Sequence, residues 1–136
     1  MKIIDIKKTD KTPEVILDTD KQLFQIKGRC LPENIRDFGK QVLASLDEYL
    51  AQQPVSDSER HAPGAFRVHF KLGYFNSASA KFIADVLSLA GSYTQKGYNI
   101  KSYWYFDEDD HDMLEAGEEI SQMVNVPMEF ITIARE

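Results

Sequence analysis

The sequence is poor in cysteine and histidine and holds no long apolar run. Cys30 is the one cysteine, so no internal disulfide can form, and three histidines add too few ligands, at these spacings, for a structural zinc site. No stretch approaches the ~20 apolar residues of a membrane span, and the N-terminus lacks the apolar segment of a signal peptide. Glycine-rich phosphate loops and a catalytic serine motif are also missing. We therefore expect a cytoplasmic protein with no metal, no cofactor and no membrane partner.

Positive charge is almost absent from the end of the sequence. Residues 102–136 hold Arg135 against 10 Asp and Glu, whereas residues 1–101 hold 15 Lys and Arg against 12 Asp and Glu. A strongly acidic region disfavours nucleic acid and anionic membranes as partners. It is compatible with a basic protein partner or with a metal ion. We expect no nucleic-acid partner.

The 136 residues, 43% of them apolar, are typical of a single domain, which we expect over 1–136. Alternating apolar residues predict strands at 12–18, 21–30, 65–74, 98–106 and 128–133, and helical spacing predicts helices from Asn34, from near Ser77 and over 109–124. The polar stretch 52–64 is expected to be an exposed loop. The order β-β-α-β-α-β-α-β calls for crossover connections and a mixed, mostly parallel sheet with packed helices, so the fold class is α/β.

The segment from Tyr74 to Lys81 is the most informative part of the chain. Asn76, Ser77 and Ser79 lie at a strand-to-helix turn, where backbone N–H groups without partners can hold an anion. A phosphate on a hydroxyl there would add a charge of about −1.5 to −2. Helix capping, worth about 1 kcal/mol, explains the same residue types. The residues alone leave both interpretations open.

The acidic run Asp107–Asp112 also has more than one interpretation. Carboxylates are favoured at the start of a helix by the helix dipole, and the same run can form a docking face for a basic partner or hold Mg²⁺. Trp104 is expected in the core, with Tyr103 or Tyr105 available as an interface anchor. Glu33 and Asn34 are either partner contacts or capping residues of the first helix.

Three segments taken together resemble the SiaC family of bacterial regulatory phosphoproteins. They are Leu31 to Asn34, Tyr74 to Lys81, and Trp104 to Asp110 running on to Gly117 and the two glutamates after it. Their order and approximate spacing agree from about Thr12 to the C-terminus. The succession of strands and helices likewise resembles the STAS domains of anti-sigma-factor antagonists, in which the switch is a Ser or Thr at the start of the helix after the central strand. The resemblance implies a STAS-like component of a partner-switching pathway that has no catalytic activity.

In this family, a dedicated kinase of the histidine-kinase-like ATPase type phosphorylates the hydroxyl directly after the Asn of the strand-to-helix turn, and a PP2C-type phosphatase reverses the reaction. The unphosphorylated form binds and activates a diguanylate cyclase, which raises cyclic di-GMP and favours biofilm or aggregation. Carried over by position, the resemblance implies that Ser77 is the phosphoacceptor. The best-known member has Thr there and hydroxyls at the next two positions, whereas this chain has Ala78 and then Ser79, so Ser79 is a second candidate.

The residues expected to contact a partner come from all of these segments. They are Glu33, Asn34, Tyr74, Asn76, Ser79, Lys81, Tyr105, Asp107, Asp109 and Asp110. Two alternative functions stay open at this stage. One is a small magnesium-dependent hydrolase that uses Asp107, Asp109 and His111, and the other is a constitutive protein-binding scaffold without phosphorylation.

Overall fold

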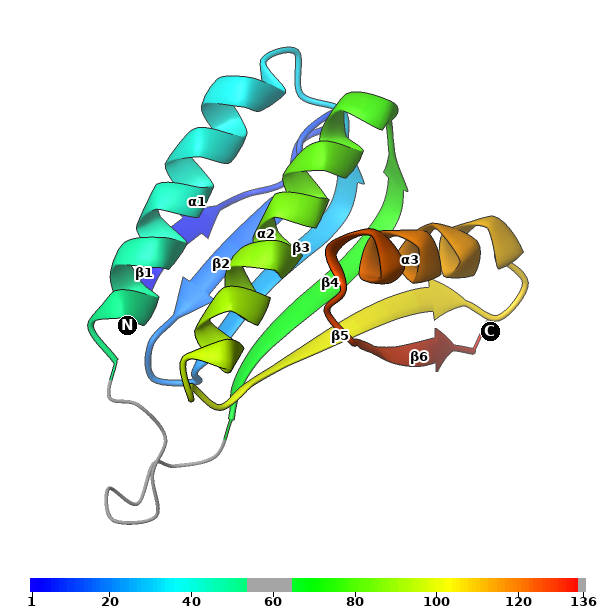
Figure 1. Cartoon of the computed structure of the whole chain (residues 1–136). Helices are drawn as coiled ribbons and strands as arrows, with labels where there is room; N and C mark the ends of the chain where they lie inside the picture. The colour runs from blue at the N-terminus through cyan, green and yellow to red at the C-terminus, as the bar shows by residue number, and fades with distance from the viewer. Residues whose placement is uncertain (54–64, 135–136) are drawn as a thin grey trace.

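In the computed structural model, which describes residues 1–53 and 65–134, six strands and three helices form one sheet and one helical layer (Figure 1). The loop expected over 52–64 lies outside the described residues from residue 54 on. None of the three described helices is long and apolar enough to cross a membrane. In chain order the elements are β1 (Lys2–Ile6), β2 (Glu14–Asp18), β3 (Leu23–Cys30), α1 (Ile35–Ala51), β4 (Phe66–Phe75), α2 (Ser77–Gln95), β5 (Ile100–Asp107), α3 (His111–Val124) and β6 (Glu129–Ile133).

The strands lie in the sheet in the order in which they occur in the sequence. The pairs β1–β2 and β2–β3 are antiparallel, and the pairs β3–β4, β4–β5 and β5–β6 are parallel. A short turn joins β2 to β3, where the Asp18 carboxylate accepts hydrogen bonds from the backbone N–H groups of Asp20 and Lys21. Each parallel pair is joined through a helix, as a crossover requires. The expected α/β class with a mixed, mostly parallel sheet is confirmed.

The first strand, β1, was not predicted from the sequence, so the expected element order lacks one strand. β1 lies at the edge of the sheet, and within it only Ile4 is buried. Its pairing with β2 is interrupted by a register shift between Lys2 and Ile4. An exposed edge strand with a bulge does not show the regular alternation of apolar and polar residues that identifies a strand.

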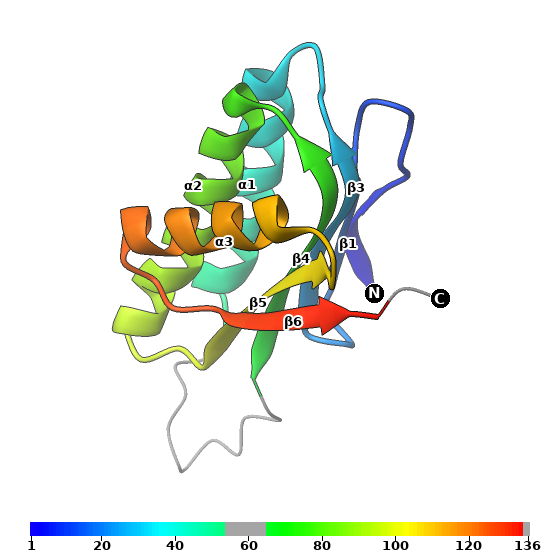
Figure 2. The same ribbon diagram turned by 90° about the vertical axis from the view of Figure 1, so that its right-hand side faces the viewer.

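All three helices cover the same face of the sheet (Figure 2). The fully buried side chains of that face include Phe24, Val68, Phe70 and Trp104 from the strands. The residues that alternate with them in the central strands, such as His69, Lys71 and Tyr105, are on the opposite face and are half-buried. The alternation predicted over 65–74 therefore corresponds to one face covered by helices and one face that none of the described helices covers.

Two glycines allow the helices to approach their neighbours closely. A Cβ at Gly39 of α1 would lie 2.8 Å from Cδ1 of Phe82 in α2. A Cβ at Gly117 of α3 would lie 2.6 Å from Cδ1 of Trp104, whose indole N–H donates a 3.0 Å hydrogen bond to the Met113 carbonyl. These contacts fix α1 against α2 and α3 against β5.

The strands β4 and β5 diverge toward their carboxyl ends. Their pairing ends at Phe70 and Trp104, whereas β4 stays paired with β3 as far as Phe75. Figure 1 shows β4 leading up to the start of α2 and β5 leading away to the start of α3. Ser77, which follows β4, and the acidic run, which follows β5, therefore lie at separate places on the molecule.

Candidate functional site

Ser77 is the first residue of α2, and its side chain is exposed. The preceding residue, Asn76, is the N-cap: its side-chain oxygen accepts a 2.9 Å hydrogen bond from the Ser79 backbone N–H, and its carbonyl accepts one from Ala80. Capping is thus carried out by Asn76, and the Ser77 hydroxyl is not needed for it. A negative charge on Ser77 would lie in the first turn, where the helix dipole favours it.

Ser79 differs from Ser77 in that its side chain has 0% exposure. Its hydroxyl has no hydrogen-bond partner among the described residues, although it lies beside the buried thiol of Cys30. Burial raises the pKa of the Cys30 thiol, and a hydrogen bond from the Ser79 hydroxyl to the thiolate form would oppose part of that rise. In this conformation a kinase cannot reach the Ser79 hydroxyl and a partner cannot contact it. Burial thus argues against both roles expected of Ser79.

Ser77 lies on a groove between α1 and α2, here called the α1–α2 groove. Figure 1 shows the two helices side by side, with their first turns at the same end of the sheet. The groove has a volume of about 620 Å³. Its lining residues are Ile35, Arg36, Gly39, Lys40 and Leu43 from α1, and Ser77, Ala78, Lys81, Phe82 and Asp85 from α2.

The α1–α2 groove combines an apolar floor with a cationic rim. Arg36, Lys40 and Lys81 bring three positive charges, and Asp85 brings one negative charge. Lys81 donates a 3.1 Å hydrogen bond to the Asp85 carboxylate, but both side chains are well exposed, so this ion pair contributes little to stability.

Sequence reasoning identified Lys81 but missed Arg36 and Lys40. Their spacing of four residues places them on one face of α1. Arg36 lies in the first turn of that helix, where the helix dipole disfavours positive charge. A cation at that position is a signal that could have identified Arg36, whereas Lys40 has only its spacing from Arg36.

Tyr74 is an exposed aromatic residue three positions before Ser77. Its side chain is 52% exposed, and the Arg29 guanidinium of the neighbouring strand lies 6.0 Å from the centre of its ring. A large exposed tyrosine is a common anchor of protein interfaces. The structure thus leaves Tyr74 accessible at the end of the strand that leads to Ser77.

The first helix is capped in the same way as α2. Asn34 accepts a 3.2 Å hydrogen bond from the Asp37 backbone N–H and donates one of 2.8 Å to the Asp37 carboxylate. Glu33 is exposed and lies 3.9 Å from the Lys11 ammonium. Both residues are near the start of α1, where the α1–α2 groove also begins.

Tyr105, Asp107 and Asp110 line a second hollow, of about 420 Å³, at the divergence of β4 and β5. Lys71 lies on the same hollow, with its ammonium 4.8 Å from the centre of the Tyr105 ring. The Tyr105 hydroxyl is 2.9 Å from Nδ1 of His69. Burial lowers the pKa of His69, as do the nearby charges of Lys71 and Arg67.

The acidic run begins the third helix, as its dipole interpretation predicts. Asp110 is the N-cap of α3 and accepts a 3.0 Å hydrogen bond from the Met113 backbone N–H. Asp107, Asp109 and His111 are exposed. Among the residues that the structure describes, no three acidic, histidine or cysteine side chains converge as they would to hold a metal ion.

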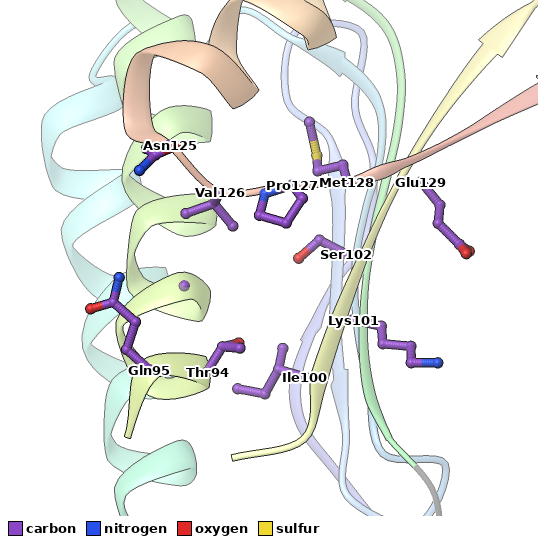
Figure 3. A pocket seen from close by; sticks show the side chains of 11 residues that line it. Thr94, Gln95, Ile100, Lys101, Ser102, Asn125, Val126, Pro127, Met128 and Glu129 are labelled. Carbon is purple, nitrogen blue, oxygen red and sulfur yellow. The ribbon is translucent and has the colours of Figure 1, made fainter. Parts of the chain in front are cut away.

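A third hollow, of about 340 Å³, lies at the opposite end of α2 from Ser77 (Figure 3). Thr94 and Ser102 point into the gap between α2 and β5, whereas Lys101 and Glu129 point away from the helices. None of the site residues expected from the sequence lines this hollow. The candidate site is therefore at the end of the sheet where α1 and α2 begin, and a separate patch lies at the start of α3.

Comparisons with known proteins agree over nearly the whole chain. The model of the family described as SiaC family regulatory phosphoproteins matches residues 6–133. An uncharacterised protein of Pseudomonas aeruginosa strain UCBPP-PA14 is 25% identical over 119 residues, which cover 88% of this chain and 87% of that protein.

Two crystal structures from Pseudomonas aeruginosa have the same fold. The chain in the structure of apo-SiaC is 22% identical in sequence to this one. The match covers 95% of this chain and 96% of the SiaC chain, with a TM-score of 0.75. A chain in the structure of the diguanylate cyclase SiaD in complex with its activator SiaC is 23% identical, with 97% and 99% of the two chains covered and a TM-score of 0.80.

Proposed function

Since this chain belongs to the SiaC family of regulatory phosphoproteins, we propose that it acts by binding partner proteins and that phosphorylation of Ser77 controls this binding. A serine/threonine kinase of the histidine-kinase-like ATPase type transfers the γ-phosphoryl group of ATP to the Ser77 oxygen, ADP leaves, and the hydroxyl proton is lost. A PP2C-type phosphatase uses water to release inorganic phosphate and restore the hydroxyl. In this proposal residues 1–136 form one cytoplasmic regulatory domain that catalyses no reaction.

The observation that carries the proposal is the contrast between the two hydroxyls of the turn. Ser77 is exposed and Ser79 is buried, while Asn76 provides the cap. Ser77 can therefore be modified without the loss of a structural hydrogen bond. A phosphate in the first turn of α2 is compatible with the helix dipole, so the fold should survive the modification.

The partner that we propose is a diguanylate cyclase, bound and activated by the unphosphorylated form. SiaC of Pseudomonas aeruginosa is the activator of such a cyclase, SiaD, and the chain in that complex resembles this one over almost all of its length. By this function the protein would raise cyclic di-GMP when Ser77 is unmodified.

We assign the partner surface to the end of the sheet where α1 and α2 begin. It includes Tyr74, Ser77 and the α1–α2 groove, with Glu33 and Asn34 beside them. The patch formed by Asp107, Asp109 and Asp110 lies beyond the divergence of β4 and β5, so we assign it to a second contact.

Phosphate would weaken docking because the partner surface must lose water when it binds. A dianion of charge about −1.5 to −2 is costly to desolvate unless it is paired. Each 1.4 kcal/mol of lost binding free energy lowers the affinity about tenfold, so a loss of a few kcal/mol reduces occupancy by about a hundredfold or more.

The direct test is phosphorylation by the kinase of this type from the same organism. We expect intact mass spectrometry to show one added phosphate and fragmentation to place it on Ser77. The Ser77→Ala variant should gain no phosphate, and the Ser79→Ala variant should be modified like the parent. An unmodified protein in the presence of a demonstrably active kinase would favour the constitutive scaffold instead.

A further inference from the structure

We propose that the α1–α2 groove binds the phosphate of Ser77 within the same molecule, through Arg36, Lys40 and Lys81. This inference rests on the proposed function, because it assigns a place to the modification described above. By this inference the phosphate group is bound by side chains of the groove and does not point into solvent.

The first step of the argument is that the cations and Ser77 share one groove. Arg36 and Lys40 are four residues apart on α1, and Ser77 and Lys81 are four residues apart on α2. Residues at this spacing lie on the same face of a helix. Because the two faces line the same groove, a group attached to the Ser77 oxygen has cations on its own helix and on the facing helix.

The second step is that the positive charge of the groove is not balanced. Lys81 is paired with Asp85, but within the described residues neither Arg36 nor Lys40 has a carboxylate within ion-pair distance. The dipole of α1 disfavours Arg36, which lies in the first turn of the helix. A phosphate would supply the missing negative charge, and Asp85 is the one carboxylate among the described lining residues that would oppose it.

The third step concerns the geometry and the surroundings. An arginine guanidinium can donate two parallel hydrogen bonds to a phosphate, and lysine adds a point charge. The groove has a volume of about 620 Å³, and Ser77, Arg36 and Lys40 on it are exposed, so a phosphate fits without separating the helices. Ile35, Leu43 and Phe82 form an apolar floor below these exposed cations, so the attraction depends on several charges acting on one dianion and not on burial.

The consequence is that the phosphate occupies the cations of the groove. The pairing lowers the desolvation cost of the dianion, so docking is weakened instead because Lys81 is drawn away from Asp85 and part of the apolar floor is covered. A partner would then lose the cations and the apolar surface together, from a single modification.

The test uses protein in which phosphoserine is incorporated at position 77 by an expanded genetic code, so that the pKa measurement needs neither kinase nor cyclase. Phosphorus NMR then follows the second ionisation of the phosphate, whose ordinary pKa is about 6. We expect the pKa in the otherwise unchanged protein to be lower by about 1 unit, because nearby cations favour the dianion. A triple variant with Arg36→Gln, Lys40→Gln and Lys81→Gln should lose most of this lowering and keep only the smaller part that the dipole of α2 contributes.

The matched control is the triple variant Lys7→Gln, Lys8→Gln and Lys21→Gln, which removes the same charge from exposed positions outside the groove. This control should keep the lowered pKa. The inference is overturned if the groove variant and the control titrate alike. A lowered pKa together with undiminished binding of the cyclase by the phosphorylated protein would keep the groove assignment and overturn the proposed function, so the two failures are distinct.

Discussion

Replacing Ser79 with alanine is expected to stabilise the protein, although most substitutions of buried residues destabilise. Ser79 is fully buried, and its hydroxyl has no hydrogen-bond partner among the described residues. A buried hydroxyl without a partner costs about 1–3 kcal/mol. Alanine also favours the helix over serine by up to about 0.5 kcal/mol. The void left by one oxygen atom offsets a few tenths of a kcal/mol, at about 24 cal/mol per Å³.

The expected net gain in the free energy of unfolding is therefore about 1 kcal/mol or more. Urea unfolding followed by circular dichroism measures it, with an unchanged dependence on urea concentration as a check that the unfolded state is the same. The melting temperature should rise by about 3–5 °C. Ser77→Ala is the matched control, because the same change at an exposed position should alter stability by no more than about 0.5 kcal/mol.

A loss of about 1 kcal/mol in the Ser79→Ala variant would refute this reasoning, since it would mean that the hydroxyl forms a hydrogen bond in the folded protein. The neighbouring Cys30 thiol would be the partner to examine, by combining Ser79→Ala with Cys30→Ala in a double-mutant cycle.

Two further predictions concern packing and pH. Gly117→Ala should lower the free energy of unfolding by about 1–3 kcal/mol, because the added Cβ would overlap the Trp104 ring, and urea unfolding measures the loss. A hydrogen bond to Asp47 raises the pKa of Tyr93 to about 12, whereas an unfolded tyrosine titrates near about 10. Between these two pH values the folded protein keeps a proton that the unfolded chain has lost, so stability should fall as pH rises through that window. Urea unfolding at a series of pH values measures this fall.

Tyr93→Phe should remove that part of the fall, and a variant that keeps it in full would contradict the assignment to Tyr93. For Gly117→Ala, an unchanged stability would mean that α3 can move away from β5 without loss, against the close packing described here.

The parts of the fold that were predicted from the sequence are those with strong local signals. The alternation from Phe66 to Leu72 identified β4, and Asn34 and Asn76 marked the starts of α1 and α2. These features depend on neighbours in sequence, and local spacing is therefore sufficient to find them. The edge strand β1 lacked such a signal. A bulge interrupts it, and only one of its residues, Ile4, is buried, so its apolar and polar residues do not alternate.

The periodicity of α2 contains more information about the site than was taken from it. Ser79 precedes the buried Phe82 and Ile83 by three and four residues, so it belongs to the inner stripe of the helix. Ser77 precedes the exposed Lys81 by four residues and belongs to the outer face. The helical period alone could therefore have separated the two candidate acceptors.

The α1–α2 groove could not be predicted in this way. Arg36 and Lys40 are about forty positions from Ser77 in the sequence. They line the same groove as Ser77 because α1 and α2 start at the same end of the sheet. The divergence of β4 and β5 is likewise a property of strand pairing, and it separates Ser77 from Asp107 and its neighbours. Such relations depend on tertiary packing and not on local pattern.

The central claim is that the state of Ser77 decides whether the cyclase is bound. The most direct measurement is the dissociation constant of the cyclase from the unmodified protein and from the protein phosphorylated at Ser77, by isothermal titration calorimetry. We predict tight binding of the unmodified protein and an affinity about a hundredfold or more lower after phosphorylation, equivalent to about 2.8 kcal/mol. Equal affinities for the two forms would contradict the account.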